Sequence, residues 1–416
     1  MRPSRTATQP GTGLRSRRRR TFVRAVAALT LAGTLGFAAA CSGGGASWRA
    51  AGEGGGEVEK PPVASATITS PAANATDVPT VMEVAFATKL ATKSSIEVTD
   101  AAGAAVKGKV NKVHTRWVPS AQLKYDMRYT VTVNATGTDG RTATATSAFT
   151  TMATPSKQVG VSSFLSDGAV VGVGMPLIVR FSHPIPEDYR DDVQRRMTVR
   201  SNPSQVGAWH WVNGTEVRYR PKKYWKPYTE ISYRIATGGL PMGDGWYGRS
   251  DLTVDVQTGS SVTMTVDNAT KQMTVKKNGK LLRTIPVSLG KPTTPSSSGT
   301  MLVIQKYRKT VFDTLAELGP KEGYRIDIEY AQRLTWGGEY IHAAPWSVAQ
   351  QGNTNVSHGC VNMSMSNAQW LFGITKVGDP VTVKGTERAL QQWNGWTDWN
   401  MSWSQWVRGS ALPVDG

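Results

Sequence analysis

Cys360 and two histidines near it in the chain are the residues best suited to covalent chemistry. Seventeen residues separate His342 from Cys360, and His358 precedes the cysteine by two positions. The thiolate is the reactive form of cysteine, and an imidazole within reach can generate it by accepting the thiol proton. Acyl transfer also needs N–H donors aimed at the developing oxyanion. The pattern therefore indicates a cysteine nucleophile for acyl transfer.

The positions of the two histidines favour one of them as the base. His342 ends a predicted strand and Cys360 sits on a returning loop, so the two side chains can meet. His358, two positions from the thiol in an extended or turn segment, would point away, although it remains the alternative base. Gly359 suits a place where the backbone approaches closely or adopts a positive φ.

Two other interpretations of the same residues stay open on spacing alone. A lone cysteine is commonly a buried and inert side chain. A zinc site of His342, His358 and Cys360 would lack both the usual ligand spacing and a fourth ligand, so no metal is expected. The cysteine count favours reactivity, because Cys41 belongs to the leader and Cys360 has no disulfide partner.

The first 41 residues are typical of a bacterial export signal. Basic residues from Arg15 to Arg24 precede an apolar, acid-free stretch that is too short and too rich in small residues for a permanent span. Arg19 and Arg20 resemble a twin-arginine signal, with general export as the alternative. Cys41 follows three alanines and precedes a glycine-rich tether, as at a lipoprotein site. We expect lipidation of Cys41 and a location on the outer face of the cytoplasmic membrane, with plain cleavage as the alternative.

The charge balance fits an envelope protein. The chain carries a net charge of +18 over 416 residues, and eight of the arginines lie in the leader. A basic body can attract nucleic acid, anionic lipid or an anionic wall polymer. No nucleic-acid motif accompanies the charge, so we expect an acidic envelope and no nucleic-acid partner.

The rest of the chain is predicted to be mainly β. Short alternating runs separated by Gly, Pro, Asn and Asp predict β-sandwiches, and Trp117-Val118-Pro119 is echoed about 100 residues later by Tyr219-Arg220-Pro221. We expect two immunoglobulin-like copies, with one large β domain as the alternative. The predicted segments are a leader over 1–41, a linker over 42–62, immunoglobulin-like domains over 63–154 and 156–258, a β-rich domain with a short helix over 259–385, and a tryptophan-rich extension over 386–416.

Three local features complete the expected organisation. Ser366 and Gln369 form a capping box that predicts the start of the one helix. The stretch 306–323 is predicted to be a mobile flap over the site. In the extension, five of the 14 tryptophans fall at spacings of three and four residues, which predicts one helical face packed on the β-rich domain. Sugar stacking or membrane contact is the alternative for that face.

The motif around the cysteine resembles a known enzyme family. His342 is followed after 14 residues by Ser357-His358-Gly359-Cys360-Val361-Asn362, which is similar to the signature of the L,D-transpeptidases with a YkuD-type catalytic domain. The likeness covers about 260–385 and includes a Thr294-Pro295 loop, lengthened here by three serines. The leader, paired immunoglobulin-like modules and tryptophan-rich tail resemble actinobacterial members of this family.

The resemblance implies a reaction and its partners. Cys360 would attack the carbonyl of the third residue of a donor tetrapeptide stem, forming a thioester and releasing D-Ala. His342 would take the thiol proton and then activate the amine of a diaminopimelate-type acceptor, which gives a 3-3 cross-link of peptidoglycan. No cofactor is implied. Carbapenem β-lactams are expected to acylate the same thiol.

The resemblance also assigns roles near the nucleophile. The carbonyl of Ala343 would hold the second ring nitrogen of His342. The amides of Gly359 and Cys360 would supply oxyanion donors, and the Tyr324 hydroxyl would face the oxyanion and the substrate.

The remaining site residues are expected to shape the cleft. His358 would orient the cysteine loop, Ser357 and Asn362 would hold it, and Trp346 and Trp336 would line the cleft. The acceptor stays open: water would make the enzyme a carboxypeptidase, and another D-amino acid or a protein lysine would give exchange or attachment. A non-catalytic wall-binding lipoprotein is the alternative outside enzymes.

Overall fold

The computed structural model describes residues 63–313, 315–323 and 325–414. The leader with Cys41, the 42–62 linker and Tyr324 lie outside the described residues. In the described part of the chain, no helix is long and apolar enough to cross a membrane. The fold is mainly β, as predicted.

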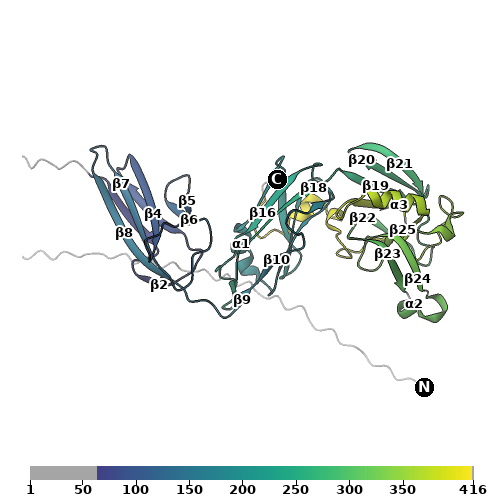
Figure 1. Cartoon of the computed structure of the whole chain (residues 1–416), viewed down its shortest axis with the longest axis horizontal. Helices are drawn as coiled ribbons and strands as arrows, with labels where there is room; N and C mark the ends of the chain where they lie inside the picture. Colours follow the sequence, from purple (N-terminus) through teal and green to yellow (C-terminus); the bar gives the residue numbers. More distant parts are fainter. Residues whose placement is uncertain (1–62, 314, 324, 415–416) are drawn as a thin grey trace, which may run out of the picture. The chain divides into compact units, whose positions relative to one another are not determined.

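The first β domain consists of two four-stranded sheets, in the orders β1-β3-β6-β5 and β2-β8-β7-β4 (Figure 1). Alternate residues along β7 are buried, which is why this polar, threonine-rich sequence still forms a core around Val131, Val133 and Phe149. The strands are β1 Ser65–Ser70, β2 Ala75–Val78, β3 Val84–Lys89, β4 Lys93–Asp100, β5 Gly108–Val110, β6 Arg116–Pro119, β7 Arg128–Thr136 and β8 Thr142–Thr151.

The second β domain repeats this plan with a larger aromatic core. Its sheets have the orders β10-β12-β15-β14 and β11-β18-β16-β13, and β9 pairs with β17. The echoed residues Trp117 and Tyr219 are both buried on corresponding strands, β6 and β15. The elements are β9 Gln158–Val159, β10 Val161–Ser163, β11 Val170–Val171, β12 Leu177–Phe181, α1 Glu187–Arg195, β13 Met197–Asn202, β14 Gly207–Trp211, β15 Glu216–Pro221, β16 Glu230–Ile235, β17 Tyr247–Gly248 and β18 Leu252–Thr258.

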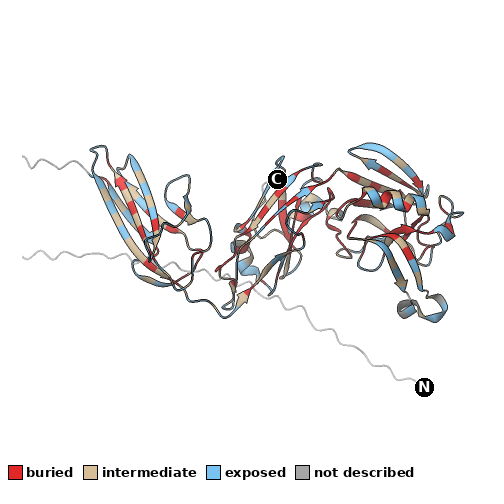
Figure 2. Ribbon diagram, in the orientation of Figure 1, coloured by how far each residue is buried: buried red, intermediate tan, exposed pale blue. Residues whose placement is uncertain are grey.

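The third domain combines a six-stranded sheet, β21-β20-β19-β27-β22-β28, with a four-stranded sheet, β23-β24-β25-β26. Buried residues concentrate where the two sheets and α3 face one another (Figure 2). The elements are β19 Val262–Asp267, β20 Gln272–Lys277, β21 Lys280–Pro286, β22 Ser297–Leu302, β23 Gln305–Asp313, α2 Leu315–Glu322, β24 Arg325–Arg333, β25 Tyr340–Ala343, η1 Pro345–Ser347, β26 Val361–Met363, α3 Met365–Ile374, β27 Pro380–Lys384, β28 Arg388–Ala389, η2 Asp398–Asn400 and α4 Trp403–Val407.

The helix after the cysteine loop starts earlier than predicted. Ser364 is the N-cap of α3, and its hydroxyl accepts a hydrogen bond from the Asn367 amide at 3.3 Å. The predicted cap, Ser366, therefore lies inside the first turn. Both serines offer the same side chain to a helix start, and the end of the short strand β26 at Met363 decides between them.

The stretch predicted to be a flap, 306–323, forms most of β23 and the tip of a β-hairpin. Strands β23 and β24 pair in register from Gln305 opposite Arg333 to Asp313 opposite Arg325, with α2 at the tip. Most of β23 is exposed or half-exposed on both faces, so its sequence is polar and lacks the alternation that marks a half-buried strand.

The tryptophan-rich extension forms neither one long helix nor a cover for the third domain alone. Its helices are short, and the indole of Trp406 donates to the Ala208 carbonyl of β14 at 2.9 Å. The guanidinium of Arg220 faces the rings of Trp399, Trp403 and Trp406 at 4.5 to 5.6 Å. The expected contact with the third domain is present, since β28 pairs with β22. The contact with the second domain was missed: β15 buries arginines, and a buried cation needs the partners that this extension supplies.

Candidate active site

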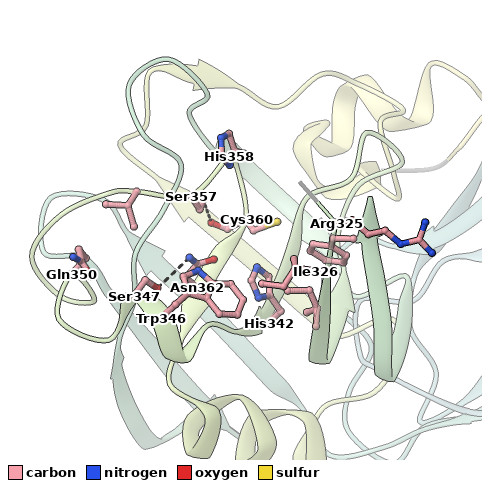
Figure 3. Close-up of a pocket in the computed structure, with 13 residues that line it drawn as sticks. Arg325, Ile326, His342, Trp346, Ser347, Gln350, Ser357, His358, Cys360 and Asn362 are labelled. Carbon is pink, nitrogen blue, oxygen red and sulfur yellow. Dashed lines mark hydrogen bonds between the residues drawn. The ribbon is translucent and has the colours of Figure 1, made fainter. Parts of the chain in front are cut away.

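Two neighbouring parallel strands bring the predicted nucleophile and base together. In the register of β25 and β26, Ile341 is opposite Val361 and His342 is opposite Asn362. Cys360 immediately precedes β26, so it lies beside the strand that carries His342. Both residues line one cleft of about 510 Å³ (Figure 3).

The cleft walls contain most of the predicted site residues and several that sequence reasoning missed. The predicted members are His342, Trp346, Ser357, His358, Cys360 and Asn362. The hairpin of β23 and β24 adds Phe312, Arg325, Ile326 and Ile328, and the remaining lining residues are Ser347, Gln350 and Val356. Trp336 is not among them: its ring contacts Trp396 and the Arg333 guanidinium instead, so its predicted role was wrong.

His342 is held in one orientation by its own backbone neighbour. Its Nδ1 lies 2.8 Å from the carbonyl oxygen of Ala343, which is the contact expected for Ala343. When Nδ1 carries the ring proton and donates it to the Ala343 carbonyl, Nε2 keeps its lone pair and can accept a proton. Burial lowers the pKa of His342 to about 4, so the imidazole is neutral at neutral pH.

The resting thiol is aimed at a carbonyl and not at the base. The Sγ of Cys360 donates to the Gly338 carbonyl oxygen at 3.8 Å, and the described residues include no hydrogen bond between Cys360 and His342. Burial, with the nearby charge of Glu339, raises the pKa of the thiol to about 12. At rest both groups are therefore neutral, because desolvation favours the neutral form of each.

The raised thiol pKa predicts slow alkylation of the folded protein. Thiolate is the reacting species. At pH values below the pKa, its fraction grows about tenfold for each unit by which the pH rises. We expect the rate of Cys360 alkylation by iodoacetamide to keep rising through pH 7 to 10, measured by intact mass. The same chain in denaturant should react far faster at pH 8, since an unperturbed thiol titrates near 8.5. A native rate that levels off below pH 8 would contradict the desolvated thiol.

The turn that carries the nucleophile depends on Ser357 and Gly359. Gly359 has a φ of +123°, which side chains rarely tolerate. The Ser357 hydroxyl accepts from the Gly359 amide at 3.1 Å and donates to the Cys360 carbonyl at 2.7 Å. The Gly359 amide is thus occupied and is not the predicted oxyanion donor. The Cys360 amide has no acceptor within the described ranges, which makes it the candidate donor.

The other predicted residues surround this turn. The Asn362 side-chain amide donates to the Ser347 hydroxyl at 3.3 Å, which ties β26 to the segment after β25. Trp346 is 54% exposed, and its ring centroid lies 6.1 Å from that of His342 at the rim of the cleft. His358 projects away from both Cys360 and His342 (Figure 3). Among the described residues, no group of three His, Cys, Asp or Glu could hold a metal ion.

A second layer of contacts behind the turn was not predicted. The Ser296 hydroxyl donates to the Gly359 carbonyl at 2.7 Å, and the Ser297 hydroxyl donates to Glu339 at 2.8 Å. Arg388 forms a short ion pair with the same Glu339 carboxylate. The lengthened serine loop was the one sequence signal for this layer, since nothing local marks Glu339 or Arg388 as partners.

Comparison with known proteins adds independent findings. Residues 261–383 match the L,D-transpeptidase catalytic domain family, and residues 75–241 match the bacterial Ig domain family, across parts of both β domains. L,D-transpeptidase 2 of Mycobacterium tuberculosis is 36% identical over 313 residues, covering 74% of this chain and 76% of the relative. L,D-transpeptidase 5 of the same species is 31% identical over 365 residues, covering 85% and 79%. A solved LD transpeptidase in complex with imipenem is 36% identical over 56% of this chain and all of that one, with a TM-score of 0.47.

Proposed function

Because this chain belongs to the L,D-transpeptidase family, we propose that it forms 3-3 cross-links between peptidoglycan stems through a thioester on Cys360. The observation that carries the proposal is the shared cleft of Cys360 and His342, with Nδ1 of His342 engaged by Ala343 and Nε2 left as the acceptor. Tetrapeptide stems are the proposed donors, and a diaminopimelate-type amine is the proposed acceptor.

The first half-reaction transfers the acyl group to sulfur. On donor binding, Sγ leaves the Gly338 carbonyl and passes its proton to Nε2 of His342 while the S–C bond forms. The tetrahedral intermediate then collapses with cleavage of the C–N bond, and His342 returns the proton to the departing D-Ala amine. A base with a lowered pKa gives its proton up readily in this second step.

The second half-reaction passes the acyl group to the acceptor. The amine attacks the thioester carbonyl, His342 takes the amine proton, and the C–S bond breaks to restore the thiol. The thioester conserves the energy of the cleaved peptide bond, so cross-linking outside the cell needs no ATP. We assign the Cys360 amide, together with the Tyr324 hydroxyl, as the donors to the oxyanion in both steps.

The walls of the cleft suit an extended peptide that carries charge. Phe312, Ile326 and Ile328 form an apolar side contributed by the hairpin, and Arg325 adds a cation to it. Ser347 and Gln350 add polar groups on the opposite side, near Trp346. A cleft with a small number of polar groups among apolar ones is typical of a site that fixes the orientation of its ligand.

Carbapenems should inactivate the enzyme by acylating Cys360. The thiol adds to the strained carbonyl, the S–C bond forms and the ring C–N bond opens, so the adduct retains the whole inhibitor mass. We expect one adduct per chain, located on Cys360 by peptide mapping, and none in Cys360→Ala. An adduct on another residue would contradict the assigned nucleophile.

The acceptor is tested by the products from purified tetrapeptide stems. Dimers linked between the third residues, with one D-Ala released per link, are the expected result. Tripeptides alone would identify a carboxypeptidase, and incorporation of an added D-amino acid would identify exchange. A Cys360→Ala variant with full cross-linking activity would instead support a non-catalytic role for this cleft.

We also propose that the chain acts at the outer face of the cytoplasmic membrane through a lipid on Cys41. The small residues before Cys41 and the tether after it support this proposal. Metabolic labelling with a fatty acid should mark the wild-type chain and not Cys41→Ala. Labelling that persists in the variant would contradict a lipid at this site.

A further inference from the structure

A buried carboxylate lies directly behind the nucleophile turn and belongs to no step of the reaction. The Glu339 side chain is 8% exposed and accepts from the Ser297 hydroxyl at 2.8 Å and the Ser297 amide at 3.3 Å. Its third partner is the guanidinium of Arg388. A buried carboxylate is costly unless it is paired and hydrogen-bonded, so this arrangement is built around the charge of Glu339.

Both members of the ion pair lie beside the turn that carries Cys360. A Cβ built on Gly359 would lie 3.6 Å from the Arg388 guanidinium and 3.7 Å from Cγ of Glu339. Ser296, next to Ser297, fixes the Gly359 carbonyl from the same side. The turn is therefore held from the cleft side by Ser357 and from behind by this group.

The pair also ties the C-terminal extension to the site. Arg388 lies on β28, which pairs in parallel with β22 so that Arg388 is opposite Ser297. The residue preceding Glu339, Gly338, supplies the carbonyl that accepts the Cys360 thiol proton. The ion pair of Arg388 with Glu339 thus links the extension to the residues around the nucleophile.

We propose that the Glu339–Arg388 ion pair positions the nucleophile by holding the Gly359–Cys360 turn from behind. The balance between the two charges of the pair also sets how readily the Cys360 thiol ionises. This inference rests on the proposed role of Cys360. The carboxylate is the negative charge that raises the pKa of Cys360, after burial. Among the described residues, the other titratable or charged groups around the thiol are His342, His358, Tyr340 and Arg325.

The two members of the pair should act on the thiol in opposite directions. Glu339→Gln removes the negative charge and leaves the Arg388 cation, so we expect native alkylation of Cys360 by iodoacetamide at pH 8.5 to become about three- to tenfold faster. Arg388→Gln leaves the carboxylate unbalanced, so the rate should fall by a similar factor. Arg388→Lys keeps the charge and should restore a rate near that of the wild type.

A matched control separates this effect from loosening of the extension. Arg218→Gln breaks a different ion pair between the extension and the rest of the chain, that of Arg218 on β15 with the buried Asp398, and should leave the alkylation rate of the full chain unchanged. If Cys360 is alkylated faster by the same factor in Glu339→Gln and Arg388→Gln, both substitutions merely loosen the turn, and the proposal is overturned. Alkylation rates equal to that of the wild type in both variants would overturn it as well.

The donor reaction supplies the second readout. Acylation by a tetrapeptide should slow in both Glu339→Gln and Arg388→Gln, because the turn loses its support, even though their alkylation rates diverge. Alkylation needs no donor or acceptor. Opposite alkylation shifts in a chain without transfer activity would therefore overturn the proposed function and leave the electrostatic role of the pair standing.

Discussion

His342→Ala is expected to lower kcat/KM for donor acylation by about 10² to 10⁴, the usual contribution of a positioned general base. The loss is large because the resting thiol is neutral, with a pKa raised to about 12, so that little of it is ionised at neutral pH without a base. The measurement is the rate of D-Ala release from a tetrapeptide stem. Since the His342 pKa is lowered to about 4, its protonation should not reduce the wild-type rate between pH 8 and pH 5.

The matched control for this prediction is His358→Ala. His358 lines the same cleft but projects away from the thiol, so its replacement should cost less than tenfold in the same assay (Figure 3). A larger loss in His358→Ala than in His342→Ala would reverse the assignment and make His358 the base.

Asp398→Ala should produce the largest loss of stability, about 3 to 5 kcal/mol, because it removes one of the two carboxylates that pair with a buried arginine. The Asp398 carboxylate is fully buried and accepts from Arg218 at 3.0 Å. Arg218 also pairs with Glu216, which limits the loss to the lower part of that range. The measurement is urea unfolding followed by tryptophan fluorescence, which reports on the aromatic cluster around Arg220.

The control for the stability prediction is an exposed ion pair. Asp139 pairs with Arg141 at 3.8 Å, and both side chains are exposed, so Asp139→Ala should change the unfolding midpoint little. If Asp398→Ala unfolds at the same urea concentration as Asp139→Ala, the buried pair does not hold the extension in place.

The parts of the site that could be predicted from the sequence are those formed by consecutive residues. The six residues from Ser357 to Asn362 form one turn and a short strand, and Gly359 is required by a local backbone angle. The repeated β domains were visible for a similar reason, since Trp117 and Tyr219 stand at corresponding places in two short-range strand patterns.

What could not be predicted depends on partners distant in the chain. Glu339 and Arg388 are separated by almost 50 residues, and neither has a local pattern that indicates the other. The contact of the extension with the second domain was missed because tryptophan spacing reports which residues share a face and says nothing of what covers it. The buried arginines of β15 decide that question, and an arginine in a predicted strand is ordinarily expected to face solvent.

The most direct test of the central claim is the mass of the enzyme during turnover. The full chain is mixed with a tetrapeptide donor without acceptor, quenched in acid within seconds and weighed intact. The account predicts a species heavier by the donor minus D-Ala, mapped to Cys360 and missing from Cys360→Ala. An adduct on another residue, or cross-linked product from Cys360→Ala, would contradict a thioester at this cysteine.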